Sequence, residues 1–380
     1  MINVDKTGVD MELAIFGAQS IALGTYQAFY KLFPQKEICC FLVTRKESNP
    51  LQLAGIPVLE LSAFASGLTQ EDKDKLKILI ATPENIMDDI EAALERFGFK
   101  NYIRQTSMRW AALMGYYYIS NAQYMPLPAF LVGCHKANLH MFMAKFYKDQ
   151  PLTENYDLPD WLTPVQAGAA LCRERVAAVL DCGGEHISQK NGNYSELTVL
   201  YWMWKKYLSQ EKAEGRSNVE YICEEKEYYG LCHYRRILEL SKDDILRLAD
   251  NEIDVVLPFP MPYEPDIEEH HKRYLADEDW NALLAALGEL QPEYASAFPA
   301  ILKQQYFYNY NIILAKKNVL AKYCRWLFPI LERVEQLSKP RGWERQDRYI
   351  GYMGETLETL YFMLNKDELN IAHTGCRFLI

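Results

Sequence analysis

The sequence predicts an α/β protein with two domains, an N-terminal Rossmann-like parallel sheet domain and a C-terminal domain built on a second α/β sheet. Its 380 residues, 49% of them hydrophobic, are enough to form two separate cores. Short apolar runs alternate with segments whose apolar residues recur at helical spacing. In the second half of the sequence several of the apolar runs end in polar or charged side chains. We therefore place the Rossmann-like domain at residues 1–108, an aromatic connector at 109–128 and the second domain at 129–380.

The first domain repeats a strand–turn–helix pattern. The apolar run 13–16 ends at Gly17, and apolar residues at helical spacing follow it. Strands that alternate with helices indicate a parallel sheet with crossover connections. Further strands are predicted at 37–43, 57–61 and 77–83, and an amphipathic helix closed by Gly98 is predicted at 84–99.

The turn after the first strand argues against dinucleotide chemistry. Dinucleotide-binding domains carry GxGxxG at this turn and an acidic residue after the second strand. At these two places the chain has Gly17-Ala18-Gln19-Ser20 and then Thr44-Arg45. We interpret the first domain as a structural or regulatory module rather than an oxidoreductase. A nucleotide bound at the free amides of a helix N-terminus stays an open alternative.

The charge and the cysteines narrow the class of protein. A net charge of −10 and a pI near 5.4 argue against nucleic-acid binding, which needs a basic face. No apolar run approaches the roughly 20 residues that span a bilayer, so we expect no membrane span, while peripheral membrane contact stays open. The N-terminus lacks signal-peptide features, and nine scattered cysteines fit a reducing compartment. We expect a cytoplasmic protein.

The second domain shows five apolar runs and several helical stretches. Thr163, Pro164 and Gln166 together form a capping-box pattern that predicts a helix over 162–171. Ser195 is the expected N-cap of an apolar helix over 196–207. The other predicted helices are 318–337 and 343–365, and the predicted strands are 129–136, 176–186, 227–236, 254–263 and 307–317.

The segment EYYGLCHYRR, residues 227–236, places two arginines at the end of an apolar strand. An unpaired guanidinium is costly to bury, so we expect an anion to meet Arg235 or Arg236. Strand alternation points the two side chains to opposite faces unless the strand ends before them. The alternative is an ion pair between one arginine and an acid such as Glu196 or Glu355.

Other polar side chains are expected at the same edge of the sheet, where open α/β sheets bind ligands. His135 and Lys136 end the first predicted strand, and Asn309 and Asn311 are expected on one face of the last. Glu196, as the first residue of a helix, suits either sugar hydroxyls or the helix dipole. Arg348 and Glu355 are seven residues apart on one predicted helical face, and His270, His271 and Arg273 form a basic cluster that either contacts an acceptor or is solvated.

Four segments of the second domain carry a family resemblance: HISQKNGNYSELTVLYWMWKK, YYGLCHYRR, DVVLPFPMPY and FYNYNIILAKK, in this order. They resemble a bacterial family, formerly a domain of unknown function with an HYRR hallmark, that occurs in capsule and exopolysaccharide gene clusters. The resemblance covers about residues 129–380 and implies a GT-A type fold. It implies transfer of a hexose from a nucleotide-diphosphate sugar, most simply a UDP-sugar, to a surface polysaccharide or glycolipid acceptor. The first domain resembles, in pattern only, small Rossmann-like domains that precede some bacterial sugar-modifying enzymes.

The resemblance also implies roles for the candidate residues. Arg235 and Arg236 would offset charge on the leaving diphosphate, and Glu196 and Glu355 are the two candidates for a catalytic base. The implied partners are the nucleotide-sugar donor and a saccharide or lipid-linked acceptor. The residues expected to bind the nucleotide sugar are His135, Lys136, Asn191, His233, Tyr234, Asn309, Asn311 and Arg348.

Metal dependence is the open question for this family resemblance. GT-A enzymes commonly hold a divalent cation with Asp-x-Asp after a strand, but here Asp72-Lys73-Asp74 and Asp277-Glu278-Asp279 do not follow strands. Arginine forks neutralise phosphate without a metal, so we expect metal-independent donor binding and predict no cofactor. Manganese or magnesium stays an alternative, because His373-Thr374-Gly375 resembles the C-terminal His-Gly element of glycogenin-like transferases, where the histidine is a metal ligand.

Two alternatives to a transferase remain. One is a non-catalytic sugar-nucleotide sensor or assembly scaffold, in which the first domain contacts a partner. The other is nicotinamide-dependent sugar chemistry in the first domain, which the Gly17-Ala18-Gln19-Ser20 turn and Arg45 disfavour.

Overall fold

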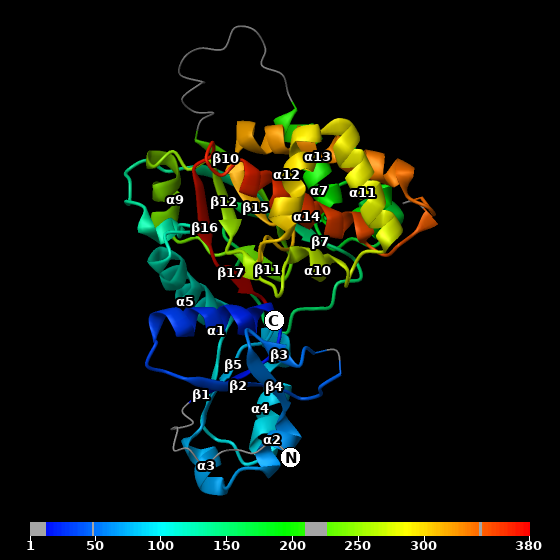
Figure 1. The fold of residues 1–380 in the computed structure, drawn as a ribbon. Helices are drawn as coiled ribbons and strands as arrows, with labels where there is room; N and C mark the ends of the chain where they lie inside the picture. The colour runs from blue at the N-terminus through cyan, green and yellow to red at the C-terminus, as the bar shows by residue number, and fades with distance from the viewer. Residues whose placement is uncertain (1–12, 48, 210–225, 342–343) are drawn as a thin grey trace. The chain divides into compact units, whose positions relative to one another are not determined.

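The structure is a computed structural model that describes residues 13–47, 49–209, 226–341 and 344–380 (Figure 1). They form two compact units that divide between Ser120 and Asn121, and each unit is described by itself. The N-terminal segment 1–12 and the first residue of the helix predicted at 343 lie outside the described residues. None of the helices within the described ranges is long and apolar enough to cross a membrane.

The first unit contains a six-stranded sheet in the order β3-β4-β2-β1-β5-β6. All neighbours in it are parallel except β3 and β4, as expected from alternating strands and helices. The strands are β1 (Leu13–Phe16), β2 (Ile38–Val43), β3 (Gln52–Leu53), β4 (Ile56–Glu60), β5 (Lys77–Ile80) and β6 (Tyr102–Arg104). The α-helices are α1 (Ser20–Leu32), α2 (Leu61–Ser66), α3 (Gln70–Lys75), α4 (Met87–Arg96) and α5 (Ser107–Ser120).

The connector predicted at 109–128 is helical over most of its length. Residues 107–120 form α5 and belong to the first unit. Trp110, Met114 and Tyr118 recur every four residues and are buried along one face of this helix. The aromatic composition therefore reflects an amphipathic helix that packs on its own unit.

The turn between β1 and α1 requires glycine. Gly17 has a φ of 127°, and a Cβ atom there would lie 2.5 Å from the carbonyl oxygen of Ala81. Both the backbone conformation and the close approach of β5 exclude a larger side chain. This glycine is explained by packing alone.

The second unit contains a mixed sheet whose main path runs β16-β12-β15-β10-β7-β8-β9. Strands β10, β7, β8 and β9 are parallel, whereas β15 runs antiparallel to both of its neighbours. The strands of the path are β7 (Asn138–Lys145), β8 (Leu162–Gln166), β9 (Val179–Leu180), β10 (Glu227–His233), β12 (Val255–Pro258), β15 (Ile313–Lys316) and β16 (Ile371–Thr374). The remaining strands are β11 (Arg236–Leu238), β13 (Met261–Pro262), β14 (Tyr306–Phe307) and β17 (Cys376–Phe378).

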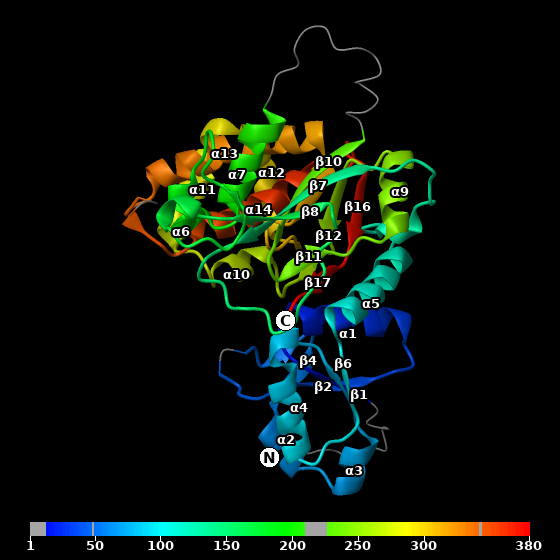
Figure 2. The same cartoon turned by 180° about the vertical axis from the view of Figure 1, so that it is seen from behind.

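Helices cover both faces of this sheet, with α7, α11, α13 and α14 grouped together and α9 apart from them (Figures 1 and 2). Successive side chains of β10 pack into two different hydrophobic cores, one on each face of the sheet. Tyr229 and Leu231 pack with α7, α11, α13 and α14. Tyr228 and Cys232 pack with α9. The helices are α6 (Asn191–Tyr194), α7 (Leu197–Met203), α9 (Lys242–Asp250), α10 (Ile267–His271), α11 (Asp277–Leu290), α12 (Pro292–Leu302), α13 (Lys317–Leu337) and α14 (Tyr349–Leu364).

Two predicted elements near the start of the second unit are wrong. Residues 129–136 do not form a strand, because the backbone amides of Cys134 and His135 donate to the Asp250 carboxylate instead of to a neighbouring strand. The helix predicted over 162–171 is instead β8, which pairs with β7. Tertiary strand pairing overrides the capping-box pattern there.

The strand predicted over 307–317 is interrupted. It consists of the end of β14 and then β15, because Tyr310 and Asn311 adopt φ values of 75° and 49°. A backbone in this left-handed region cannot continue a strand. Asn309 therefore lies just before a turn that contains Asn311, and the prediction that they share one face of a strand is wrong.

Candidate functional site

The second unit contains a cavity of about 960 Å³ at the carboxyl ends of β7 and β10. The two strands are parallel and Ala144 is opposite His233, so the residues that follow each strand meet at one edge of the sheet. Nine of the twelve residues predicted from the sequence line this cavity: Asn191, Glu196, His233, Tyr234, Arg235, Arg236, Asn309, Arg348 and Glu355.

A tight hairpin brings both arginines to the cavity. Strand β10 ends at His233, and β11 begins at Arg236 and pairs back antiparallel. Tyr234 and Arg235 form the turn, and the amide of Tyr234 donates to the Ala144 carbonyl at 3.1 Å. Because the strand ends before the arginines, alternation does not separate them, and both line the cavity.

The two guanidinium groups rest on aromatic rings. That of Arg236 lies 4.1 Å from the ring centre of Tyr310 and 5.0 Å from that of Phe378. That of Arg235 lies 5.4 Å from the ring of Tyr234, and its buried Nε has no hydrogen-bond partner. Within the described ranges neither arginine forms an ion pair with a carboxylate, so the predicted alternative of pairing with Glu196 or Glu355 is not found.

Three further charged residues at the end of β7 line the cavity and were not predicted from the sequence. Lys145 is the last residue of β7, and Lys148 and Asp149 follow within the next turn of chain. Burial raises the pKa of Asp149, although the nearby charges of Lys145 and Arg235 oppose this shift. In the sequence these residues follow the apolar run NLHMFMAK, which was not predicted to be a strand.

The loop before α7 is fixed by a buried aspartate. Asp181 accepts hydrogen bonds from the amides of Gly168 and Ala169 and from the hydroxyls of Ser188 and Thr198, at 2.5–3.0 Å. The side chain of Asn191 donates to the Ser195 carbonyl at 2.8 Å, so its amide shapes this loop. The prediction that Ser195 caps α7 is wrong, because its φ is 50° and its hydroxyl accepts from Arg348 at 2.9 Å.

Glu196 lies at the centre of the polar wall and is 6% exposed. Its carboxylate accepts a hydrogen bond from the Asn311 side chain at 2.7 Å. Asn311 itself does not line the cavity but supports Glu196, which does. His233 Nε2 and an Arg348 nitrogen each lie 3.7 Å from this carboxylate. His233 Nε2 also lies 2.5 Å from the Tyr310 carbonyl, which can only accept, so this nitrogen carries the proton.

Glu355 is the second carboxyl group of the cavity. Burial, and then the neighbouring charge of Glu196, raise its pKa to about 8. Burial lowers the pKa of His233, so the imidazole is neutral. The site thus pairs a carboxyl group that is protonated near pH 7 with a second, hydrogen-bonded carboxyl group.

Aromatic rings form another wall of the cavity. Tyr263 stacks on His270 with ring centres 3.6 Å apart, and Tyr274 lies 5.2 Å from His270 and 5.3 Å from Tyr352. Burial lowers the pKa of His270 to about 4 and that of His271 to about 3. Both imidazoles are buried and neutral, so of the predicted cluster of His270, His271 and Arg273 the two histidines add no positive charge and are not solvated.

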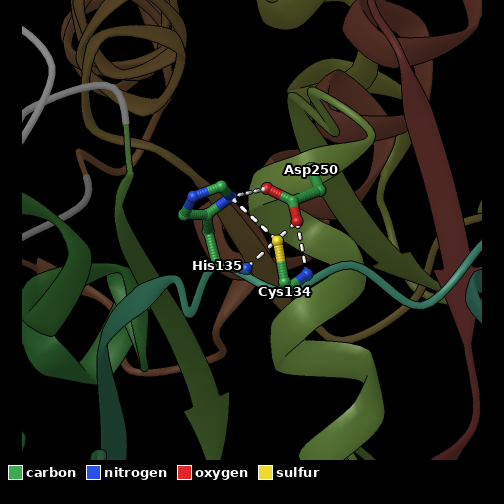
Figure 3. Close-up of side chains that lie close together, drawn as sticks. All are labelled: Cys134, His135 and Asp250. Carbon is green, nitrogen blue, oxygen red and sulfur yellow. Dashed lines mark hydrogen bonds and ion pairs between the residues drawn. The ribbon is translucent and has the colours of Figure 1, made fainter.

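His135 and Lys136 lie away from the cavity. They precede β7, and the carboxyl end of β7 lines the cavity, so both residues lie at the other end of this strand. His135 pairs with Asp250 of α9 at 2.7 Å (Figure 3). Their predicted position at the carboxyl end of a strand is wrong.

The motifs considered as metal ligands are used otherwise. Asp279 is buried and accepts two hydrogen bonds of 2.7 Å from Arg345, and Asp72 forms a capping box with Thr69, the N-cap of α3 in the first unit. His373 is buried in β16 beside the Tyr308 hydroxyl at 2.7 Å, and burial lowers its pKa to about 3. Among the residues that the structure describes, no group of three histidine, cysteine or acidic side chains with metal-ligand spacing lies in the cavity.

These features define a mixed α/β protein with a large polar and aromatic cavity at the carboxyl edge of its sheet. The chain belongs to the family described as a domain of unknown function, DUF4422, whose model matches residues 153–366. It is also similar in fold to a solved structure, the apo form of the WbbM bifunctional glycosyltransferase, with a TM-score of 0.50 and 24% identity. That likeness covers 63% of this chain and 45% of the other, so the chain spans less than half of that protein. No curated protein matches the sequence.

Proposed function

We propose that this protein is a glycosyltransferase that moves a hexose from a nucleotide-diphosphate sugar, such as a UDP-sugar, to a surface polysaccharide or glycolipid acceptor. One observation carries the proposal: a single cavity combines an arginine hairpin without carboxylate partners among the described residues with two neighbouring carboxyl groups, Glu196 and Glu355. The fold likeness and the family support it. We further propose a cytoplasmic location and a structural or regulatory role for the first unit.

The arginine hairpin is the proposed diphosphate site. Arg235 and Arg236 follow β10, Lys145 ends the adjacent parallel strand β7, and Lys148 follows that strand. Four cations at one edge offset the charge of a diphosphate without a metal ion, and arginine binds phosphate oxygens in a bidentate manner. The rings of Tyr310 and Phe378 hold the guanidinium of Arg236 in place before the ligand arrives.

We assign the catalytic base to Glu355 for an inverting transfer. The acceptor oxygen forms a bond to the anomeric carbon, the bond from that carbon to the diphosphate oxygen breaks, and its electron pair leaves with the nucleoside diphosphate. The acceptor hydroxyl proton goes to the Glu355 carboxylate. A pKa of about 8 makes this carboxylate a stronger base than an ordinary glutamate, and Glu196 is the neighbour that tunes it.

The aromatic wall is the proposed acceptor side. Tyr274 is 52% exposed and lies beside Tyr352, and the rings of both line the cavity. Such rings offer an apolar face to the C–H side of a sugar ring while hydroxyls bond to neighbouring polar groups. The unpartnered Oδ1 of Asn309 supplies one acceptor for a sugar hydroxyl.

Release of UDP from a panel of UDP-hexoses, without added acceptor, tests the transferase against the sensor. We expect slow hydrolysis by the wild-type chain and its loss in Glu355→Gln with UDP affinity retained. Binding of UDP with no turnover of any donor in the panel would favour the sensor or scaffold. Stoichiometric NAD(P) in the purified protein would instead favour oxidoreductase chemistry in the first unit.

A further inference from the structure

Three side chains with metal-binding atoms converge at the other end of β7, outside the cavity (Figure 3). Cys134 and His135 come from the loop before β7, and Asp250 is the last residue of α9. One ligand atom from each lies within 4.8 Å of the others. Within the described residues this is the only such group of three.

The spacing of sulfur and nitrogen is that of a tetrahedral zinc site. Bonds of about 2.3 Å from zinc to sulfur and about 2.1 Å to nitrogen place the two ligand atoms about 3.6 Å apart. Cys134 Sγ and His135 Nδ1 are 3.6 Å apart. His135 Nδ1 and Asp250 Oδ1 are 2.7 Å apart and must separate to about 3.3 Å, which a ring 61% exposed to solvent can do by rotation.

The backbone prepares this arrangement. The second carboxylate oxygen of Asp250 accepts from the amides of Cys134 and His135, at 2.6 and 3.0 Å, and leaves Oδ1 to the side-chain ligand set. A Cβ atom on Gly133 would lie 2.2 Å from Asp250, so only glycine allows the loop to approach the helix end this closely. Such outer hydrogen bonds orient metal-binding carboxylates.

We infer that Cys134, His135 and Asp250 form a zinc site with one coordination position left for water or a further ligand. A thiolate and an imidazole favour zinc over calcium or magnesium, which prefer oxygen ligands. Strand β7, eight residues long, separates this site from the cavity by roughly 23 Å. The metal therefore ties the loop to α9 and does not hold the donor diphosphate, and the inference is independent of the proposed function.

Cobalt(II) and zinc titrations of the metal-free full-length chain test the site. We expect one equivalent of cobalt to give a thiolate charge-transfer band with tetrahedral d–d bands, and zinc to displace it. Cys134→Ser should abolish the charge-transfer band, and His135→Ala should weaken zinc binding by at least about tenfold, as loss of even an outer partner does. Cys172→Ser is the matched control, because Cys172 is a partly exposed free thiol of the same unit outside the group of three.

A loss of metal binding in these variants can be told apart from a loss of folding, because the side chains of Cys134 and His135 are exposed and their replacement leaves the core intact. An unchanged zinc affinity in both His135→Ala and Cys134→Ser would overturn the inference. Loss of the band in Cys172→Ser would do the same. Retention of the band in that control, together with its loss in Cys134→Ser, would support the site.

Discussion

Glu355 and His270 both line the cavity, and burial moves their pKa values in opposite directions. Desolvation disfavours the charged form of each, so the carboxyl group keeps its proton and the imidazole gives its proton up. The cavity therefore holds fewer charges near pH 7 than its composition indicates. The basic side chains that line it and are not histidines are arginines and lysines.

The raised pKa of Glu355 predicts a pH dependence of transfer. If Glu355 is the base, the rate rises with pH and levels off above about 8. Glu196→Gln removes the carboxylate whose charge contributes to the shift, so the inflection of the pH–rate profile should move to lower pH. An inflection that stays in place in this variant would contradict the coupling between the two groups.

The same shift predicts the sign of a stability effect. Because the folded state holds this proton more tightly than the unfolded chain, the contribution of Glu355 to stability is lost as pH rises from about 4.5 to about 8. Glu355→Gln should therefore raise the melting temperature more at pH 9 than at pH 5. An equal change at both pH values would show that Glu355 ionises normally.

The arginine hairpin gives a prediction for ligand affinity. Each charge-assisted hydrogen bond to phosphate is worth roughly 1.5–3 kcal/mol, so alanine at Arg235 or Arg236 should weaken UDP binding about tenfold to over a hundredfold. Arg236→Ala should cost more, because two rings hold its guanidinium in place. Lysine should recover only part of the loss. Isothermal titration measures this effect.

Arg333→Ala is the matched control for the hairpin. Arg333 is partly exposed, pairs with Glu289 and does not line the cavity, so its loss should leave UDP affinity unchanged. If both hairpin variants fold and bind UDP as tightly as the wild type, the two arginines are structural.

At the scale of elements, segments that follow their own local pattern were predictable, and segments determined by distant partners were not. The helix predicted at 318–337 is confirmed as α13, and the strand predicted over 227–236 is confirmed for its first seven residues as β10. The runs 129–136 and 162–171 were misassigned, because a distant carboxylate and a neighbouring strand determine them. Local spacing contains no information about such partners.

Several residues that line the cavity could be selected from the sequence. The HYRR segment was recognisable because arginines after an apolar run are costly without an anion. Asn309 was expected there for a different reason, since it lies in the break between β14 and β15 and not within a strand. Lys145 and Tyr274 were missed, because a single lysine or tyrosine carries no spacing signal.

The turn after β1 gives a prediction for the first unit. Gly17→Val should unfold or strongly destabilise this unit, because its Cβ would clash with the Ala81 carbonyl. Gly55→Ala is the control, since Gly55 also has a positive φ of 76° but nothing lies within 4 Å of a Cβ there. The transfer rate per folded molecule should stay unchanged in both variants. A loss of turnover in Gly17→Val at an unchanged melting temperature would show that the first unit takes part in the chemistry.

At the scale of the whole molecule, the positively charged side chains of the cavity and the proposed zinc ligands lie in separate places. The arginine hairpin is in the cavity, and the Cys134–His135–Asp250 group is at the other end of β7. EDTA should therefore remove bound zinc and lower the melting temperature while UDP-sugar affinity stays the same. Loss of that affinity on chelation, restored by manganese, would contradict metal-independent donor binding.

The central claim is that the cavity of the second unit binds the donor through its arginine hairpin. A crystal structure of the full chain with UDP and EDTA tests it most directly. We expect the diphosphate within hydrogen-bond distance of Arg235 or Arg236, the uridine inside the cavity, and no nucleotide at the Gly17 turn. UDP bound in the first unit, or a diphosphate out of reach of both arginines, would contradict the account.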